Sequence, residues 1–375
     1  MLKLAIVVNE PPPYRIPVFN LIARNPEIRL QVIFCCRREP NRLWDLPPVA
    51  FDQVFLRERI RTVHGRYIHN NPDVLIALSR FRPDVVLGNG FNPTHLYAFA
   101  WTRLIRRAYI AMTDGTLQSE QSLSALHVRL RRYVYQRAGA FVAASQGGLA
   151  LYRSYQVPAA RCFRSCLAVD NAQFNPHGVV DEKKWDFIFS GRLEAGKRPE
   201  FAMEVALQCA RRLGRQLTLL YVGSGSQEAA LRTRASALGH ELMVHFQGFA
   251  RQSELPQLYL SAKMFLFPTQ ADVWGVVANE ACAAGLPVIV SPHAGVANEL
   301  VVDGQNGYVR PLDVPAWTTC ALELLDDSNR LRAMGERSLL LVQPYCFESA
   351  AQGIVDASKA AHAFSYDYAS VRRPV

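Results

Sequence analysis

The residues best suited to chemistry lie within positions 267–309 of this 375-residue chain. Asp272 and Glu280 stand eight positions apart, and Gly275 lies between them at the start of a helix-compatible run. Glycine lets a ligand approach the backbone closely, and the first turn of a helix offers unpaired N–H groups at the positive end of its dipole. Such a turn binds phosphate, so we expect a diphosphate here. The two carboxylates can accept hydrogen bonds, one from sugar hydroxyls and the other from a ribose diol.

Two cations follow an earlier strand-like segment. Gly191 and Arg192 come directly after the apolar run Asp186–Ser190, and Lys197 lies five residues further on. Loops of this kind deliver charge to the carboxyl edge of an open α/β sheet, where ligands bind. A guanidinium and an ammonium group can neutralise a departing nucleoside diphosphate.

A second glycine-bearing turn, GSGS at 223–226, follows the next strand-like segment and is expected on the same edge. A G-x-G alone also occurs in ordinary turns. The candidate catalytic residues are Arg192, Lys197, Asp272 and Glu280. The candidate donor-binding residues are Gly191, Gly223, Gly225, Trp274, Gly275, Val276 and Glu280.

Several other chemistries lack their residues. We find no Ser-His-Asp or Cys-His set for nucleophilic catalysis, no Asp-x-Asp, and no G-x-G-x-x-G after the first strand-like segment, which disfavours a dinucleotide-dependent oxidoreductase. The eight cysteines lack zinc spacing. We therefore expect no metal and no cofactor, and reduced thiols in a cytoplasmic protein.

These residues need elements to position them. Short apolar segments alternate with helical patterns, restart after the middle of the chain, and predict an α/β fold with two parallel sheets. The expected strands are 4–9, 29–35, 84–87, 109–112, 140–144, 186–190, 216–223, 243–247, 264–268 and 287–291. The expected helices include 75–80, 124–137, 200–213, 228–238 and 276–284.

The domain prediction follows from this restart. A first Rossmann-like domain is expected over 1–176 and a second over 177–345. Their link falls near 175–184, which is polar and lacks apolar periodicity. Residues 346–375 are expected to form a helix that crosses back to the first domain, with a tail that frays from about Ala363.

The second half resembles a known family. Residues 272–289 read DVWGVVANEACAAGLPVI, similar to the acid-x7-acid signature of retaining family-4 glycosyltransferases, which belong to glycosyl transferases group 1. Gly295, Glu299 and Asp303 also match in order, as does GRL at 191–193. The resemblance is strong over 186–313 and weak before about residue 140. It implies the GT-B fold, in which two Rossmann-like domains face each other across a cleft. The first domain would then hold the acceptor and the second the nucleotide-sugar donor.

The resemblance also implies roles for the candidate residues. Glu280 would bind the ribose diol, Asp272 the donor sugar, and Arg192 and Lys197 the diphosphate. The first acid is Asp rather than the usual Glu, so its reach is one methylene shorter. Such enzymes substitute on one face of the sugar, where a phosphate oxygen takes the acceptor proton.

The acceptor side departs further from the family. The usual Gly-Gly loop after the first strand is replaced by PPPYRIP at 11–17, a stiff loop with one cation. Acceptor-side candidates are Arg15, His95 and Asp114. Asp114 and His95 have structural alternatives, Asp114 as a turn residue or helix N-cap and His95 as a surface or satisfied histidine. For Arg15 a structural role is an equal alternative.

Charge is divided unevenly between the halves. Residues 1–176 hold 23 of the 42 Lys and Arg and 11 of the 32 Asp and Glu, a formal charge of +12 against +10 for the whole chain. We expect this half to meet an anionic membrane surface or an anionic acceptor, although a solvated basic surface explains the excess too. The run HVRLRRYVYQR at 127–137 is typical of a cationic amphipathic helix. We find no nucleic-acid-binding motif and no membrane-spanning run.

The predicted function is therefore transfer of a sugar from a nucleoside diphosphate, uridine by default, to an anionic glycan, a glycolipid or a polyprenyl-diphosphate-linked acceptor. Cell-surface polysaccharide or lipopolysaccharide-type synthesis, in the cytoplasm and peripherally at the inner face of its membrane, fits best. The alternatives are a sugar-nucleotide epimerase or phosphorylase on the same fold, or a non-catalytic GT-B binding module.

Overall fold

The computed structural model describes residues 1–40, 45–63, 66–121, 123–175 and 183–370, which form two compact units. The first unit comprises residues 1–168 together with those from Phe347 on, and the second comprises 169–346. The predicted link at 175–184 lies largely outside the described residues. The chain thus divides eight residues before the predicted boundary, and each unit is described separately below.

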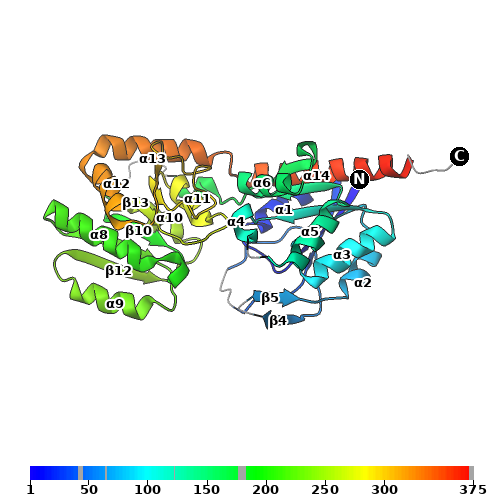
Figure 1. Ribbon diagram of the computed structural model, residues 1–375, viewed down its shortest axis with the longest axis horizontal. Helices are drawn as coiled ribbons and strands as arrows, with labels where there is room; N and C mark the ends of the chain where they lie inside the picture. The colour runs from blue at the N-terminus through cyan, green and yellow to red at the C-terminus, as the bar shows by residue number, and fades with distance from the viewer. Residues whose placement is uncertain (41–44, 64–65, 122, 176–182, 371–375) are drawn as a thin grey trace. The chain divides into compact units, whose positions relative to one another are not determined.

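The first unit is built on a seven-stranded parallel sheet in the order β3-β2-β1-β6-β7-β8-β9 (Figure 1). Its strands are β1 (Leu2–Val8), β2 (Ile28–Phe34), β3 (Asp52–Phe55), β6 (Val85–Asn89), β7 (Ala108–Thr113), β8 (Ala140–Ala143) and β9 (Cys162–Arg164). An antiparallel hairpin, β4 (Ile60–Val63) and β5 (Arg66–His69), stands apart from this sheet.

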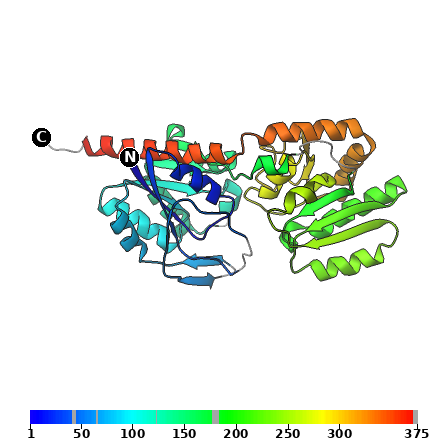
Figure 2. The same cartoon turned by 180° about the vertical axis from the view of Figure 1, so that it is seen from behind.

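Helices flank the first sheet. They are α1 (Ile16–Ala23), α2 (Val74–Phe81), α3 (Pro93–Leu104), α4 (Leu117–Glu120), α5 (Ala125–Tyr135), α6 (Gln146–Ser154), the 3-10 turn η1 (Ala159–Arg161) and α14 (Phe347–Ser370). Helix α14 packs beside α1 and over β7, β8 and β9, so the C-terminal segment returns to the first unit (Figure 2). The helix runs to Ser370, seven residues beyond Ala363, the point from which the sequence predicts a frayed tail.

The second unit carries a six-stranded parallel sheet in the order β12-β11-β10-β13-β14-β15. Its strands are β10 (Trp185–Ser190), β11 (Leu217–Val222), β12 (Leu242–Gly248), β13 (Ala262–Phe267), β14 (Val288–Val290) and β15 (Gly307–Val309). Its helices are α7 (Asn171–Phe174), η2 (Ala195–Lys197), α8 (Pro199–Leu213), α9 (Glu228–Ala237), α10 (Leu255–Leu260), α11 (Val276–Ala283), α12 (Val314–Asp326) and α13 (Ser328–Val342). The predicted α/β fold with two Rossmann-like units is confirmed.

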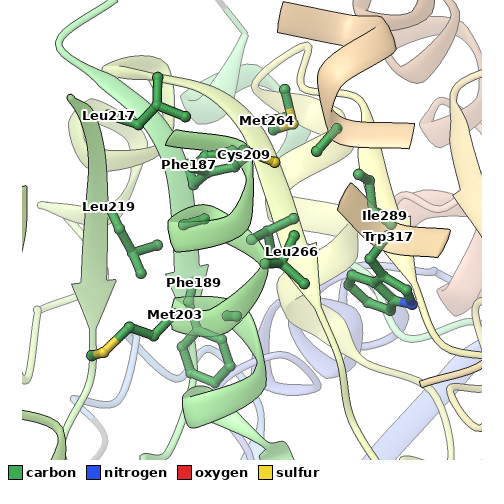
Figure 3. Packing of buried hydrophobic residues seen from close by; sticks show 14 of the residues in the cluster. Phe187, Phe189, Met203, Cys209, Leu217, Leu219, Met264, Leu266, Ile289 and Trp317 are labelled. Atoms are coloured by element: carbon green, nitrogen blue, oxygen red, sulfur yellow. The ribbon is translucent and has the colours of Figure 1, made fainter. Parts of the chain in front are cut away.

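The core of the second unit fixes the positions of its strands. Every residue of β10 is buried, as expected of a central parallel strand covered on both faces. One face of the sheet packs on α8 and α12, with Trp317 fully buried between them (Figure 3). The strand residues in this layer include Phe187, Phe189, Leu217, Leu219, Met264, Leu266 and Ile289. The loops that follow these strands therefore start from fixed points.

Candidate functional site

The site in the second unit lies where the order of the strands reverses. The chain runs from β10 outward to β12, then returns to β13 on the other side of β10. Ligands of open α/β sheets bind beyond the carboxyl ends of the strands at such a switch point. The loops that leave β10 and β13 here are 191–198 and 268–275, the two loops that the sequence singled out.

An ion pair joins these loops. Lys197 Nζ lies 2.5 Å from Asp272 Oδ2, and each side chain is 22% exposed. The backbone reinforces the contact, because the N–H of Gln270 donates to the carbonyl of Gly196 at 2.9 Å. The other carboxylate oxygen, Asp272 Oδ1, accepts from the Trp274 N–H at 3.2 Å. The structure thus brings a predicted phosphate-binding cation and a predicted sugar-binding acid into direct contact.

Helix α11 begins directly after this ion pair. Its N-cap is Gly275, with φ of 108°, and a Cβ atom there would lie 2.3 Å from Cε1 of Phe267. Only glycine fits both the backbone conformation and the space. Val276 opens the first turn and is partly exposed. The N–H groups of a helix's first turn point back along its axis, here toward the loop that carries Asp272. The geometry matches a phosphate-binding helix start.

Glu280 lies inside the unit, one turn further along α11. The side chain is 5% exposed, and its Oε2 accepts a hydrogen bond from the Tyr259 hydroxyl at 2.8 Å. Burial raises the pKa of the Glu280 carboxyl to about 7, and the hydrogen bond from Tyr259 opposes that rise. This carboxyl therefore changes charge near neutral pH.

The loop after β11 packs against the loop after β10. A Cβ on Gly223 would lie 2.1 Å from the Gly191 carbonyl oxygen, and one on Gly225 would lie 2.5 Å from that of Leu193. The two glycines thus let the backbones touch. Their predicted donor contacts stay predictions.

Arg192 is exposed on the first of these loops. Next to it, Glu194 accepts hydrogen bonds from the Ser226 hydroxyl and N–H, and these bonds hold the pKa of Glu194 below its usual value, with a smaller contribution from Arg192. The loop that carries Arg192 is thereby tied to the glycine-bearing turn, while the guanidinium faces solvent.

One donor-binding candidate is corrected. The Trp274 side chain is fully buried: its indole N–H donates to Asn279 Oδ1 at 2.8 Å, and its ring lies 5.3 Å from that of Tyr345. A donor can meet this residue only through its backbone. The indole instead anchors the loop between Asp272 and α11.

Arg15, predicted on the acceptor side, is corrected in the same sense. It is 2% exposed, and its guanidinium donates to Asp114 Oδ1 at 2.9 Å, to both the hydroxyl and the carbonyl of Ser165, and to the carbonyl of Cys166. It ties together the loops after β1, β7 and β9. Asp114 keeps 25% exposure and remains an acceptor candidate.

His95 is also corrected. It lies in the first turn of α3 with no exposed surface, and burial lowers its pKa to about 4. A neutral, enclosed imidazole cannot contact an acceptor directly. Neither ring nitrogen has a hydrogen-bond partner within the described residues, so His95 is not the satisfied or surface histidine of the structural alternative either.

Some site residues carried no signal in the sequence. Tyr259 lies 21 positions before Glu280 in the short helix α10, where a tyrosine between leucines looks like core. The backbone of Asp272 is held by His293, whose carbonyl accepts its N–H at 3.1 Å, and by Gly295, a residue that matched the family in the sequence and whose N–H donates to its carbonyl at 2.9 Å. Among the described residues, no group of three or more His, Cys, Asp or Glu side chains could hold a metal ion.

The fold is similar to that of solved glycosyltransferase structures. The chain resembles the solved structure of Anabaena Alr3699/HepE in complex with UDP, with a TM-score of 0.76 and 16% identity over 96% of this chain and all of that one. It also resembles WaaG, a glycosyltransferase involved in lipopolysaccharide biosynthesis, with a TM-score of 0.66 and 17% identity over 93% and 98% of the two chains. At these identities the likeness shows the fold, which is that of GT-B glycosyltransferases.

The family match lies in the second unit. Residues 170–339 match the family described as glycosyl transferases group 1. A relative from Nocardia farcinica, D-inositol 3-phosphate glycosyltransferase, is 33% identical over 180 residues, which are 46% of this chain and 40% of that protein. The chain spans less than half the length of the curated relatives it matches.

Proposed function

We propose that this protein transfers a sugar from a nucleoside diphosphate, UDP by default, to an acceptor hydroxyl with retention of the anomeric configuration. One observation carries the proposal. The Lys197–Asp272 ion pair, the glycine-capped start of α11 and the buried Glu280 all lie at the strand switch point of the second unit. The family match over the same residues supports it.

Each group has a distinct task in this proposal. Lys197 and Arg192, with the first turn of α11, hold the diphosphate and stabilise the charge that develops as it leaves. Glu280 accepts hydrogen bonds from the ribose hydroxyls. Asp272 accepts from a hydroxyl of the donor sugar and, through its ion pair, holds Lys197 at the leaving group.

The reaction needs no protein nucleophile. The acceptor hydroxyl attacks the anomeric carbon on the face from which the diphosphate leaves. The bond between that carbon and the diphosphate oxygen breaks as the bond between the carbon and the acceptor oxygen forms. The acceptor proton passes to the leaving phosphate oxygen. Because cationic side chains and helix N–H groups balance the leaving charge, we propose that no metal ion is required.

For the acceptor, we propose a glycan or a lipid-linked sugar used in building a cell-surface polysaccharide, with the enzyme in the cytoplasm at the inner membrane face. Asp114, at the carboxyl edge of the first sheet, is the acceptor-side residue that keeps exposed surface. The basic charge of residues 1–176 favours an anionic acceptor.

A thermal-shift screen tests the donor. A ligand at about 100 times its dissociation constant stabilises the folded state by roughly 2.7 kcal/mol. We expect UDP or one other nucleoside diphosphate to raise the melting temperature, and the rise to survive EDTA. If no nucleotide shifts the transition, the donor site assigned here is wrong and a non-catalytic module becomes the better reading.

A product assay then tests the reaction. The nucleotide sugar that gives the largest shift is incubated with and without a panel of sugar and lipid-linked acceptors. Transfer predicts a nucleoside diphosphate and a glycosylated acceptor of the same anomeric configuration. An altered nucleotide sugar formed without any acceptor identifies an epimerase instead.

A further inference from the structure

One outer face of the first unit combines arginines with exposed apolar side chains. Helix α5 exposes a continuous stripe of side chains to solvent, because its exposed residues recur every three or four positions. The stripe contains Leu126, Arg129, Arg132, Tyr133 and Arg137. Leu126 is 72% exposed and Tyr133 is 50% exposed, so neither side chain is part of the core.

The end of α3 continues this face. The ring of Tyr133 meets that of Phe99 in α3 edge-on at 6.1 Å, which places the two helices side by side (Figure 1). Beyond Phe99, residues 103–107 read RLIRR and are all exposed. Leu104 is 83% exposed, more than any other large apolar side chain of the described residues. We call the surface formed by 103–107 and the α5 stripe the α3–α5 face.

The charge of this face is of one sign. Residues 93–107 and 125–137 contain seven arginines and no Asp or Glu. Neighbouring acids pair with two of them, Arg107 with Asp84 and Arg131 with Glu120. The other five, Arg103, Arg106, Arg129, Arg132 and Arg137, form no ion pair within the described residues.

The tyrosine of the stripe is held at the surface by one of these arginines. The Arg137 guanidinium lies 3.9 Å from the centre of the Tyr133 ring, and its Nη1 donates to the Tyr133 carbonyl. An aromatic ring beside a cation suits the zone between lipid headgroups and acyl chains. Exposed leucines next to unpaired arginines can insert into that zone while the arginines meet lipid phosphates.

We propose that the α3–α5 face docks on an anionic lipid bilayer. The partner follows from charge and apolar exposure together: a polyanion without an apolar phase leaves Leu104, Leu126 and Tyr133 in water. Helix α5 starts at the carboxyl edge of the sheet, the edge that bears Asp114 and the half-exposed Leu117. The other end of the face, 103–107, precedes β7 and lies at the amino edge, where Arg107 pairs with Asp84. Docking therefore lays the side of the unit along the bilayer and brings the acceptor edge beside it, a purpose that rests on the proposed function, whereas the binding itself does not.

The test is sedimentation of the full chain with vesicles and no sugar donor. We expect binding to phosphatidylcholine vesicles that contain phosphatidylglycerol, little binding to phosphatidylcholine alone, and a decrease as salt is raised. The double substitution Arg129→Glu and Arg132→Glu should weaken binding about tenfold or more. Leu126→Gln should weaken it by a smaller factor without changing its salt dependence.

A matched control uses two exposed arginines of the second unit, Arg212→Glu and Arg215→Glu, which change the net charge equally. Each variant is first checked for an unchanged melting temperature. The inference is overturned if the wild type ignores anionic vesicles, if the α5 variant binds as well as the wild type, or if the control loses as much. Because no donor is present, failure here leaves the transferase proposal standing, and absence of a nucleotide shift leaves this result standing.

Discussion

The hydroxyl of Tyr259 and the carboxyl of Glu280, 2.8 Å apart, couple a helix that makes no predicted ligand contact to the proposed ribose site. Tyr259 is fully buried, and its hydrogen bond to Glu280 favours the carboxylate and so lowers the pKa that burial raises to about 7. The hydroxyl of Tyr259, which lies behind the site, therefore influences the charge of the Glu280 carboxyl that the nucleotide meets.

Tyr259→Phe should therefore change the pH dependence of nucleotide binding. Without the hydroxyl, the pKa of Glu280 rises, more of the carboxyl is protonated at pH 7, and it accepts less from the ribose. We expect UDP affinity to fall about three- to tenfold at pH 7 and to recover at higher pH. Calorimetric titration with UDP from pH 6 to 9 measures this affinity for both proteins.

The matched control is Tyr221→Phe. That hydroxyl is also buried in the second unit, but it donates to the carbonyl of Pro199. Loss of stability without a change in the pH profile is expected there. If both variants behave alike, the link between Tyr259 and Glu280 is merely structural.

Glu280→Gln should stabilise the ligand-free protein at pH 8. An acid whose folded-state pKa lies above its unfolded value loses its stabilising contribution as pH rises from 4.5 through about 7. Glutamine removes that loss, which is at most about 3 kcal/mol. We expect a higher melting temperature than wild type at pH 8, a smaller difference at pH 5, and no UDP shift at either pH. A variant that melts lower at pH 8 contradicts the assignment.

Substitutions at Lys197 and Asp272 should have different effects, the first on nucleotide binding and the second on sugar binding. Lys197→Met removes a phosphate contact, so UDP itself should bind about 10- to 100-fold more weakly. Asp272→Asn should leave UDP affinity within about threefold, while the extra affinity for the nucleotide sugar and the transfer rate fall. Titration of both ligands distinguishes the two, and equal losses for UDP in both variants would argue against separate roles.

The control for charge loss is Lys263→Met. Lys263 pairs with Asp186 at 2.8 Å, and these residues lie at the starts of β13 and β10, the opposite edge of the same sheet. Its removal should affect stability and leave nucleotide affinity unchanged.

Gly225→Ala should damage the site through the backbone. The added Cβ falls 2.5 Å from the Leu193 carbonyl oxygen, so the loop that carries Arg192 must move. Gly196→Ala, on the same loop, meets nothing within 4 Å and serves as the control. We expect lower melting temperature and weaker UDP binding for the first variant only. Normal binding by Gly225→Ala would mean that the two loops need not touch.

Arg15→Met should destabilise the first unit strongly. It leaves Asp114 without its cation and removes the guanidinium donors to Ser165 and Cys166. Breaking a buried pair in this way costs about 3–5 kcal/mol. Denaturant unfolding should show this loss, a smaller one for Arg15→Lys, and almost none for the exposed Arg24→Met. An equally stable Arg15→Met variant with poor acceptor affinity would restore the original view of Arg15 as an acceptor contact.

The sequence predicted the fold well where strands are buried on both faces. The segment 140–144 is a continuous apolar run and 186–190 has an apolar centre, and both form strands that are buried throughout, β8 and β10. It missed β3, whose residues are exposed or half-buried, and the three-residue strands β9 and β15, because partial burial and short length leave no pattern. It placed the switch-point loops correctly because their glycines and charges follow buried strands.

The site was less readable where it depends on burial. Arg15 and His95 look like ligand-binding residues in a loop and at a helix start, but only the tertiary structure reveals that both are enclosed. The prediction that Trp274 binds the donor failed for the same reason, since its neighbours in sequence lie at the ligand edge while its ring points inward. Conversely, Tyr259 gains its importance from a contact between two helices that no local pattern encodes.

The return of α14 to the first unit has a consequence for synthesis of the protein. Gly139 accepts this helix so closely that a Cβ there would lie 3.2 Å from Ala361, and Gly353 allows α14 to lie directly on Arg164. During translation, residues 1–168 emerge first but lack the helix that covers β7, β8 and β9. The second unit, contiguous in sequence, can be complete before them. The unit whose sheet is made before the other is thus finished after it, and its uncovered strands await α14 as an intramolecular partner.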